Sequence, residues 1–252
     1  MRTLLKKNKN WALHIVVPAY NEEKDIIIWL SSLVRSRWRE YIRTVIVVDD
    51  GSTDKTVVAI KAFNNKLPLK IVSYRSNGGP GFAFRKGLLE AVKSAKSGDL
   101  VVTMECDNTS DLGILEMMIE KVNSGSDVCV ASYYTVGGGF ADVPWWRMLI
   151  SEVGNVVIRW GCGIRQVKTF SSFYRVFRPE VLRELARRTN GKLFIENGFA
   201  CMVELLARLV RQGAVVSEVP MVLVGSKRKG KSKMRILPTV LGYFRVVLQY
   251  RL

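Results

Sequence analysis

The chain has 252 residues, of which 48% are hydrophobic, so it can bury a full core as one α/β domain or as a domain with an appendage. The net charge of +17 suggests a nucleic-acid partner, but twelve of the surplus cations lie before Glu22 or after Glu218, in ends without acids. The body is only mildly basic, so we expect no nucleic-acid partner. Four single cysteines without a CxxC pair and one histidine support neither a disulfide framework nor a zinc site, and they favour a reducing cytosolic setting.

Apolar runs alternate with helical patterns along the first half of the chain. Strands are expected over residues 13–17, 43–50, 69–74, 100–104 and 127–131. Helices are expected from the first loop to about residue 38, over 53–63 and 82–96, and from residue 111. Alternation of this kind predicts an α/β domain with a doubly wound, mostly parallel sheet. His14, inside an apolar strand, is expected to be a core residue.

Paired acids follow two of these strands. Asp49 and Asp50 end the second strand, at the sheet edge where open α/β sheets bind ligands. The alternative is that these acids and Ser52 cap the next helix. Glu105 and Asp107 follow the fourth strand with a spacing of two, which in extended chain places both side chains on one face. That arrangement suits a hard divalent cation carrying phosphates, whereas an acid-rich surface turn is the alternative.

A basic run precedes an apolar C-terminal segment. Six cations lie within residues 227–235, and residues 236–252 follow as ILPTVLGYFRVVLQYRL. The longest uninterrupted apolar or neutral stretch, 236–244, is far short of the ~20 residues of a spanning helix. The segment is expected either to lie on an anionic membrane surface or to pack on the core as a helix. No signal peptide is expected, because the first ten residues carry charge without an apolar run.

Several motifs in one order resemble a known family. PAYNEE (18–23), VVDDGSTD (47–54), NGGPG (77–81) and ECD (105–107) resemble the family 2 glycosyltransferases, which are inverting sugar-nucleotide enzymes with the GT-A fold. Later motifs are similar to those of the polyprenyl-phosphate sugar transferases of the dolichyl-phosphate mannose synthase type. They are GGG (137–139), Trp146-Arg147, SSFYRVFR (171–178), GFACMVELLARL (198–209), EVP (218–220) and GKSKM (230–234). The resemblance covers roughly residues 12–240.

The resemblance implies a single GT-A domain over residues 12–224 and a basic, amphipathic, membrane-proximal segment over 225–252. The implied reaction is inverting transfer of a sugar from a nucleotide-diphospho-sugar of the GDP-mannose or UDP-glucose type to a polyprenyl phosphate. Mg²⁺ or Mn²⁺ would be the cofactor. The protein would be cytoplasmic and peripheral at the cytoplasmic face of a membrane. An anionic membrane surface would be its partner, and a membrane-protein subunit is a second candidate partner.

The resemblance also implies roles for individual residues. The nucleotide-binding set is Pro18, Ala19, Tyr20, Glu22, Asp49, Asp50, Ser52, Gly79, Arg85 and Cys106. Glu105 and Asp107 would hold the metal. The residues expected to face phosphate groups of donor or acceptor are Arg147, Arg175, Ser232 and Lys233. The expected catalytic set is Asp107, Arg147, Arg175 and Lys233.

Three positions depart from the family pattern. Glu105 replaces the usual aspartate, which puts metal affinity or metal choice in question. Tyrosines at 133 and 134 stand where an arginine is expected after the fifth strand. Lys227 replaces the first arginine of the RxxGxSK motif, with Arg228 beside it. Because these changes gather around the sugar and its phosphates, the donor could differ from GDP-mannose.

The chemistry of the acceptor separates the possible functions. A polyprenyl phosphate is already anionic, so the site needs charge neutralisation and in-line positioning rather than a strong base. A sugar hydroxyl would need an added carboxylate, for which Glu204 is the candidate, although its spacing to Arg208 favours a structural pair. Two alternatives stay open: a sugar transferase with a soluble or polysaccharide acceptor, and a non-catalytic membrane or nucleic-acid binder.

Overall fold

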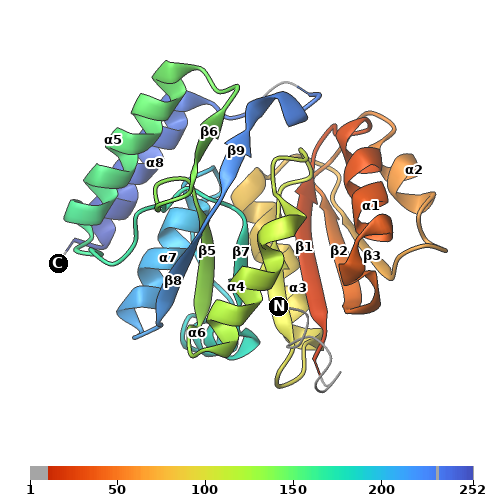
Figure 1. Cartoon of the computed structure of the whole chain (residues 1–252), viewed down its shortest axis with the longest axis horizontal. Helices are drawn as coiled ribbons and strands as arrows, with labels where there is room; N and C mark the ends of the chain where they lie inside the picture. The colour runs from red at the N-terminus through yellow and green to blue at the C-terminus, as the bar shows by residue number, and fades with distance from the viewer. Residues whose placement is uncertain (1–10, 231–232, 252) are drawn as a thin grey trace.

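A seven-stranded sheet runs through the centre of the computed structural model, which describes residues 11–230 and 233–251 (Figure 1). The strand order is β3-β2-β1-β4-β7-β5-β8. The strands are β1 Leu13–Ala19, β2 Ile42–Asp49, β3 Leu69–Ser73, β4 Leu100–Thr103, β5 Val128–Ser132, β7 Arg175–Phe177 and β8 Val216–Pro220. All neighbours are parallel except β7, which is antiparallel to β4 and β5. The mostly parallel sheet predicted from the sequence is confirmed.

The apolar strands are buried on both faces, as a sheet covered by two helix layers requires. Ile15 and Val17 pack into the core on one face, and Val16 between them packs into the core on the other. Side chains of α1, α2 and α4 complete the first core, and those of α3, α6 and α7 complete the second. His14 is fully buried with its Nε2 3.1 Å from Asp99 Oδ2, which confirms that it is a core residue.

The first four helices follow the expected order with shifted ends, and four more lie among the described residues of the second half of the chain. They are α1 Asp25–Arg35, α2 Thr56–Lys61, α3 Pro80–Ser94, α4 Leu115–Asn123, α5 Trp145–Gly161, α6 Pro179–Arg188, α7 Cys201–Arg211 and α8 Ile236–Gln249. Short 3-10 turns lie at Arg37–Glu40, Leu112–Ile114 and Gly225–Lys227. Helix α2 begins at Thr56 rather than at residue 53, after a turn in which Asp54 Oδ1 accepts the Thr56 N–H at 2.9 Å. Helix α1 ends at Arg35, because Ser36 is extended with ψ 153°.

Two strands of the main sheet and a second sheet were not predicted. Strand β8 lies beside β5 at the edge of the main sheet, where only the EVP motif was noted. Strand β7 has only three residues and lies between β4 and β5, where an unbroken parallel series was expected. The second sheet pairs β6, Gly139–Ala141, with β9, Val222–Val224, in parallel. Segments this short carry too little alternation to be predicted from the sequence.

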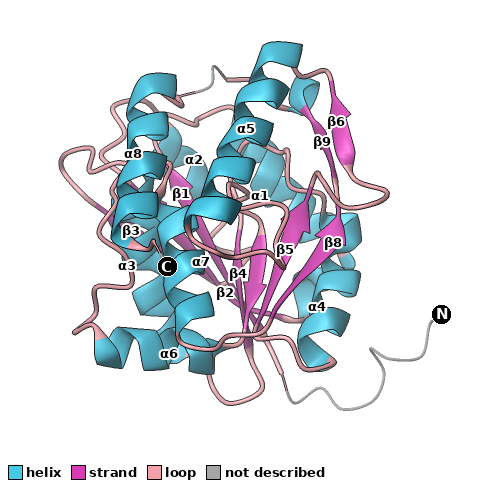
Figure 2. Ribbon diagram, turned by 90° about the vertical axis from the view of Figure 1, so that its left-hand side faces the viewer, coloured by secondary structure: helices cyan, strands magenta, loops and turns pink. Residues whose placement is uncertain are grey.

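The C-terminal helix packs on the domain. Helices α5 and α8 lie side by side (Figure 2), and α8 also contacts α7. Its inward face carries Thr239, Gly242, Val246 and Tyr250, and a Cβ on Gly242 would come within 2.7 Å of Ala200 Cβ. Contacts therefore cross the domain boundary expected after residue 224. Among the described residues, no helix combines the length and apolar character needed to cross a membrane.

Candidate active site

A cavity of about 1740 Å³ opens beyond the carboxyl ends of β1, β2 and β4 and continues to α5 and α8. Its two halves differ in chemistry. The half at the sheet edge is acidic, with lining residues Glu22, Asp50, Glu105 and Asp107. The other half is mostly apolar, with lining residues Phe140, Val143, Trp146, Ile150, Phe199, Val240 and Tyr243. Ligand pockets commonly measure 300–1,000 Å³, so this cavity has room for two substrates.

The first two motifs are joined by hydrogen bonds at the acidic half. Ser52 Oγ accepts the Asn21 N–H at 3.0 Å, and Asn21 Oδ1 accepts the Thr53 N–H at 2.8 Å. Asn21 has the left-handed φ of 52°, which asparagine tolerates better than most residues. Thr56 Oγ1 accepts the Glu22 N–H at 2.8 Å. These contacts fix the loop after β1 so that Tyr20 and Glu22 line the cavity.

Six of the ten expected nucleotide residues line the cavity, and one of the six is Cys106. The other five are Pro18, Ala19, Tyr20, Glu22 and Asp50. Asp49, Ser52, Gly79 and Arg85 are not among the lining residues. Asp49 Oδ1 accepts the Ser52 N–H at 3.1 Å in the turn after β2, and helix α2 begins only at Thr56, so neither residue caps that helix. Arg85 instead donates to the Phe194 carbonyl at 2.9 Å and to Asn197 Oδ1 at 3.0 Å.

Asp50 shapes the loop that precedes α3. Its two carboxylate oxygens accept the N–H groups of Gly78 at 2.9 Å and Gly79 at 2.8 Å. Gly79 has a φ of 90°, and a Cβ there would lie 2.5 Å from the Asn197 carbonyl oxygen, so the loop needs glycine. Burial raises the pKa of Asp50, while the two N–H groups oppose this shift.

We therefore expect Asp50→Asn to weaken both the loop and donor binding. The amide NH₂ would face a backbone N–H, and an unsatisfied buried group costs about 2 kcal/mol, which lowers the melting temperature by about 6 °C in a chain of this size. Calorimetry should show weaker nucleotide binding as well. An unchanged melting temperature would contradict the role of the carboxylate in the loop. Unchanged nucleotide binding would contradict a role for this loop in the donor site.

Glu105 and Asp107 bring two carboxylates together at the end of β4. Asp107 is 4% exposed, and its Oδ1 accepts the N–H and Oγ1–H of Thr109 at 3.0 and 2.7 Å. Burial and the neighbouring Asp107 raise the pKa of Glu105. Two like charges held this close favour a cation between them. The described residues hold no group of three or more His, Cys, Asp or Glu side chains placed for a metal. The pair therefore fits a hard cation whose remaining ligands are phosphate oxygens and water.

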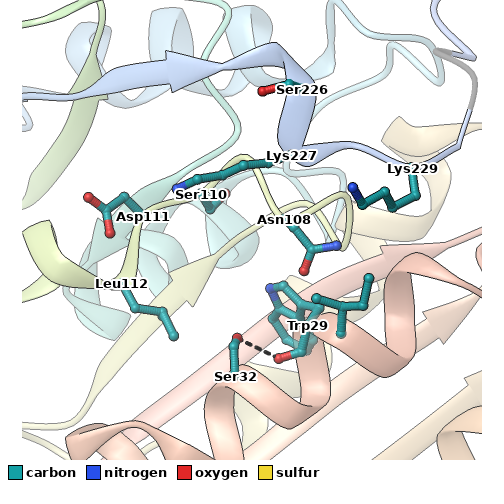
Figure 3. A pocket seen from close by; sticks show the side chains of 10 residues that line it. Trp29, Ser32, Asn108, Ser110, Asp111, Leu112, Ser226, Lys227 and Lys229 are labelled. Atoms are coloured by element: carbon teal, nitrogen blue, oxygen red, sulfur yellow. Dashed lines mark hydrogen bonds between the residues drawn. The ribbon is translucent and has the colours of Figure 1, made fainter. Parts of the chain in front are cut away.

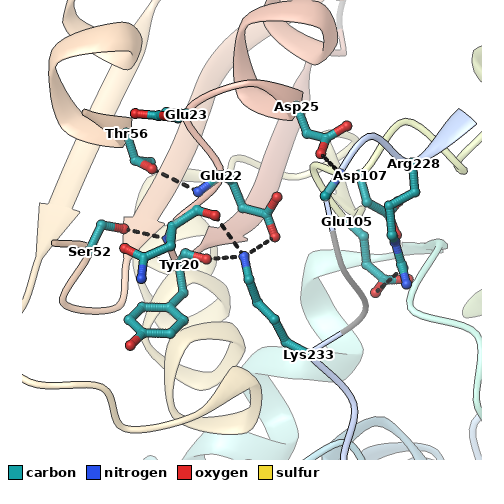
Figure 4. Close-up of polar contacts among 12 residues, drawn as sticks. Tyr20, Glu22, Glu23, Asp25, Ser52, Thr56, Glu105, Asp107, Arg228 and Lys233 are labelled. Carbon is teal, nitrogen blue, oxygen red and sulfur yellow. Dashed lines mark hydrogen bonds and ion pairs between the residues drawn. The ribbon is translucent and has the colours of Figure 1, made fainter. Parts of the chain in front are cut away.

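One cation contacts this pair, and a second cation lies at the neighbouring Glu22. Arg228 Nε donates to Asp107 Oδ2 at 2.8 Å, and its Nη2 lies 3.9 Å from Glu105 Oε1. Lys233 Nζ donates to Glu22 Oε1 at 2.5 Å and to the carbonyls of Tyr20 and Asn21 (Figure 4). Lys233 thus lines the cavity as expected, but its ammonium lies at the first motif loop. Ser232, the other expected phosphate ligand in this motif, lies outside the described residues.

Arg147 is placed in the cavity and Arg175 is not. Arg147, in the first turn of α5, lines the cavity with its guanidinium 5.1 Å from the Trp146 ring. Its buried Nε has no hydrogen-bond partner among the described residues. Arg175 on β7 is fully buried and donates to the carbonyls of Phe170, Ser172 and Met202, so the expectation that it faces a phosphate disagrees with its position. Burial lowers the pKa of Arg175 to about 10.

Aromatic side chains occupy the position after β5 where the family pattern has an arginine. Tyr133 lines the cavity and its ring centre lies 5.1 Å from that of Phe140.

Glu204, considered as a base, is fully buried and outside the cavity lining. It pairs with Arg208 at 2.7 Å, as its spacing predicted.

Three comparisons place the chain among known proteins. The profile of glycosyl transferase family 2 matches residues 14–186. A dolichol-phosphate mannosyltransferase from Pyrococcus furiosus is 29% identical over 242 residues, which cover 94% of this chain and 62% of that protein. A polyprenol monophosphomannose synthase from Mycolicibacterium smegmatis is 27% identical over 224 residues, covering 87% of this chain and 80% of that protein.

A solved structure gives the same picture of the fold. Glucosyl-3-phosphoglycerate synthase from Mycobacterium tuberculosis, in complex with Mn²⁺, UDP and phosphoglyceric acid, superposes with a TM-score of 0.64. The two are 18% identical, and the match covers 95% of this chain and 78% of that one. The fold and cavity define a GT-A-like glycosyltransferase domain. The chain belongs to glycosyl transferase family 2, and it spans less than two thirds of the length of the Pyrococcus relative.

Proposed function

We propose that the chain transfers a sugar, with inversion, from a nucleotide-diphospho-sugar to a polyprenyl phosphate at a membrane surface. One observation carries the proposal: a single cavity joins an acidic half, suited to a metal and a diphosphate, to an apolar half beside α5. Arg147 lies in that apolar half, and its Nε has no hydrogen-bond partner in the part of the chain that the structure describes. A cation in apolar surroundings is suited to the phosphate of an apolar molecule. The relatives named for transfer to dolichol and polyprenol phosphates support the same acceptor.

The acidic half would hold the donor. Pro18, Tyr20 and the Asp50 loop would enclose the nucleoside, while Glu105 and Asp107 would hold Mg²⁺ or Mn²⁺ against the diphosphate. The Mn²⁺ in the M. tuberculosis synthase supports a divalent ion at such a site. When bound, the ion would stabilise the negative charge that develops on the leaving diphosphate.

Transfer would be a single displacement. A phosphate oxygen of the acceptor attacks the anomeric carbon, the bond between that carbon and the diphosphate oxygen breaks, and the nucleoside diphosphate leaves. Arg147 would orient the attacking phosphate, and no proton has to be removed from it at neutral pH. Only positioning and charge neutralisation are needed, so this route requires no general base. Two carboxylates line the cavity near the apolar side chains: Asp142 accepts a hydrogen bond from Ser226 Oγ, and Glu196 pairs with Arg245.

A panel of radiolabelled sugar nucleotides tests the function. Each donor is incubated with polyprenyl phosphate or with 3-phosphoglycerate as a soluble acceptor, and the products are separated by solvent extraction. We expect one or more donors to label the lipid fraction and none to label the soluble acceptor. Label in the soluble acceptor alone would favour the alternative transferase, and label in neither would favour a binding protein.

Exposed apolar stripes on α5 and α8 support docking at a membrane. On α5 the stripe is Trp145, Leu149, Val153, Val156 and Trp160. On α8 it is Leu237, Leu241, Phe244 and Leu248. Each stripe follows helical spacing and the two helices are neighbours (Figure 2). We propose that the two stripes together form one apolar face. An apolar face next to a basic segment fits an anionic bilayer surface.

We expect Leu237→Glu/Leu248→Glu to release the protein from anionic vesicles. Both side chains are about 70% exposed, so the change should leave the fold intact. Moving two charges toward the bilayer interior costs several kcal/mol, so vesicle-bound protein should fall by at least about tenfold in co-sedimentation. Val58→Glu is the matched control, since Val58 is 69% exposed on α2, outside the apolar face. Equal binding by the double variant and the control would contradict docking through α5 and α8.

A further inference from the structure

A short segment lies across the acidic half of the cavity and is held there by acids. We call residues 225–230 the strap. Ser226 Oγ donates to Asp142 Oδ2 at 2.6 Å at one end. In the middle, Arg228 contacts Asp107, and at the other end the N–H groups of residues 229 and 230 donate to Asp25 (Figure 4). The strap therefore has three separate anchors on the body of the domain.

Asp25 is the most buried of these anchors. Its side chain, in the first turn of α1, is 1% exposed. Its Oδ1 accepts the Lys229 N–H at 3.0 Å, and its Oδ2 accepts the Gly230 N–H at 2.8 Å. A Cβ on Gly230 would lie 3.1 Å from Asp25 Oδ2, so the strap approaches too closely for a larger residue to fit easily. A buried carboxylate is costly unless it is hydrogen-bonded, so Asp25 favours the docked strap.

Docking the strap places a cation at the expected metal position. Arg228 donates to Asp107 Oδ2 at 2.8 Å and lies 3.9 Å from Glu105 Oε1. These are the same two side chains that would ligate the metal. The neighbouring lysines of the strap point elsewhere: Lys227 and Lys229 line a separate cavity of about 490 Å³ beside Trp29 and Asn108 (Figure 3). Arg228 is the strap cation that reaches the acid pair.

We propose that Asp25 is a positioning residue that docks the strap and thereby holds the Arg228 guanidinium at the metal position until a metal and donor arrive. Arg228 serves as a built-in cation for Glu105 and Asp107 in the donor-free protein. The metal must displace it, so the strap shifts when the donor site fills. This inference rests on the metal site of the proposed function, but it concerns only the donor-free protein.

Binding of Mn²⁺ alone, followed by electron paramagnetic resonance without nucleotide or acceptor, tests the proposal. Hydrogen bonds to charged groups contribute about 1.5–3 kcal/mol, so Arg228→Gln should bind Mn²⁺ at least about tenfold more tightly than the wild type. Lys229→Gln is the matched control, because it removes the same charge one residue away and keeps the N–H that binds Asp25. It should change Mn²⁺ affinity little. An equal gain in Mn²⁺ affinity in both variants, or no gain in Mn²⁺ affinity in Arg228→Gln, overturns the proposal.

The role of Asp25 is tested through Arg228. Asp25→Asn keeps the shape of the side chain but turns an NH₂ toward one strap N–H, so it should also tighten Mn²⁺ binding. If Asp25 acts by placing Arg228, the double variant Asp25→Asn/Arg228→Gln should gain no more than Arg228→Gln alone. Additive gains, or no gain for a folded Asp25→Asn, would overturn the positioning role. Circular dichroism establishes folding, and should Asp25→Asn not fold, Gly230→Ala, which crowds the same contact, takes its place.

The result is separable from the proposed function. A wild-type protein that transfers sugar to polyprenyl phosphate, combined with no gain for Arg228→Gln, would reject the inference and keep the function. A gain for Arg228→Gln without any lipid transfer would keep the inference and reject the acceptor.

Discussion

Asp107→Asn should lower sugar transfer by about a thousandfold or more, since the loss of one charge-stabilising group at a reacting centre commonly costs about 10²–10³ and here the proposed metal ligand is lost as well. The fold should survive, because the asparagine oxygen can still accept both hydrogen bonds from Thr109. Steady-state kinetics beside a thermal melt separate the two effects.

Two companion measurements define the role of the metal. EDTA should abolish transfer by the wild type, and added Mg²⁺ or Mn²⁺ should restore it. Glu105→Asp should keep most of the activity, because it retains a carboxylate at the same strand end. Full activity in EDTA, or an active Asp107→Asn, would contradict a metal held by this pair.

Arg147→Gln should lower kcat/KM for the acceptor by about a hundredfold, since a charge-assisted bond to a reacting phosphate contributes about 3 kcal/mol. Nucleotide binding should stay unchanged, because Arg147 lies in the first turn of α5, in the apolar half of the cavity. The kcat/KM of Arg147→Lys should lie between those of the wild type and Arg147→Gln, because lysine keeps the charge but lacks the planar guanidinium.

Arg159→Gln is the matched control for Arg147. It lies on the same helix, but its Nε donates to the Val167 carbonyl at 3.1 Å and it does not line the cavity. Transfer should be nearly normal in this variant. Similar losses in both variants would show that Arg147 acts through the stability of α5, and weaker nucleotide binding would move Arg147 to the donor.

The acids at the sheet edge could be predicted because parallel strands present their carboxyl ends together. The strands of Val47 and Val102, β2 and β4, both pair with β1 in parallel. The acids that follow these two strands therefore meet in one cavity. The same reasoning could not separate Asp50 from Asp49. Both are buried, but only Asp50 lines the cavity.

Other features depend on contacts that are distant in the chain. Arg175 was expected at a phosphate because its position in SSFYRVFR matches the family motif, yet three backbone carbonyls accept its hydrogen bonds inside the core. The contact between Asp25 and the strap joins residues more than two hundred positions apart. Asp25 carries no motif signal, so only the folded chain reveals it. The sequence left two alternatives for the C-terminal segment, a helix on a membrane surface or a helix packed on the core. In the structure one face of α8 packs on the domain, and the other face exposes apolar side chains.

The most direct test of the central claim compares two lipids that differ only in the acceptor phosphate. The wild-type protein is incubated with its labelled donor and a divalent metal, and either polyprenyl phosphate or the matching polyprenol is added. We predict labelled lipid only with the phosphate, and a product whose anomeric configuration, read by NMR, is opposite to that of the donor. Equal labelling of the polyprenol would contradict a phosphate oxygen as the nucleophile, and retained configuration would contradict the single displacement.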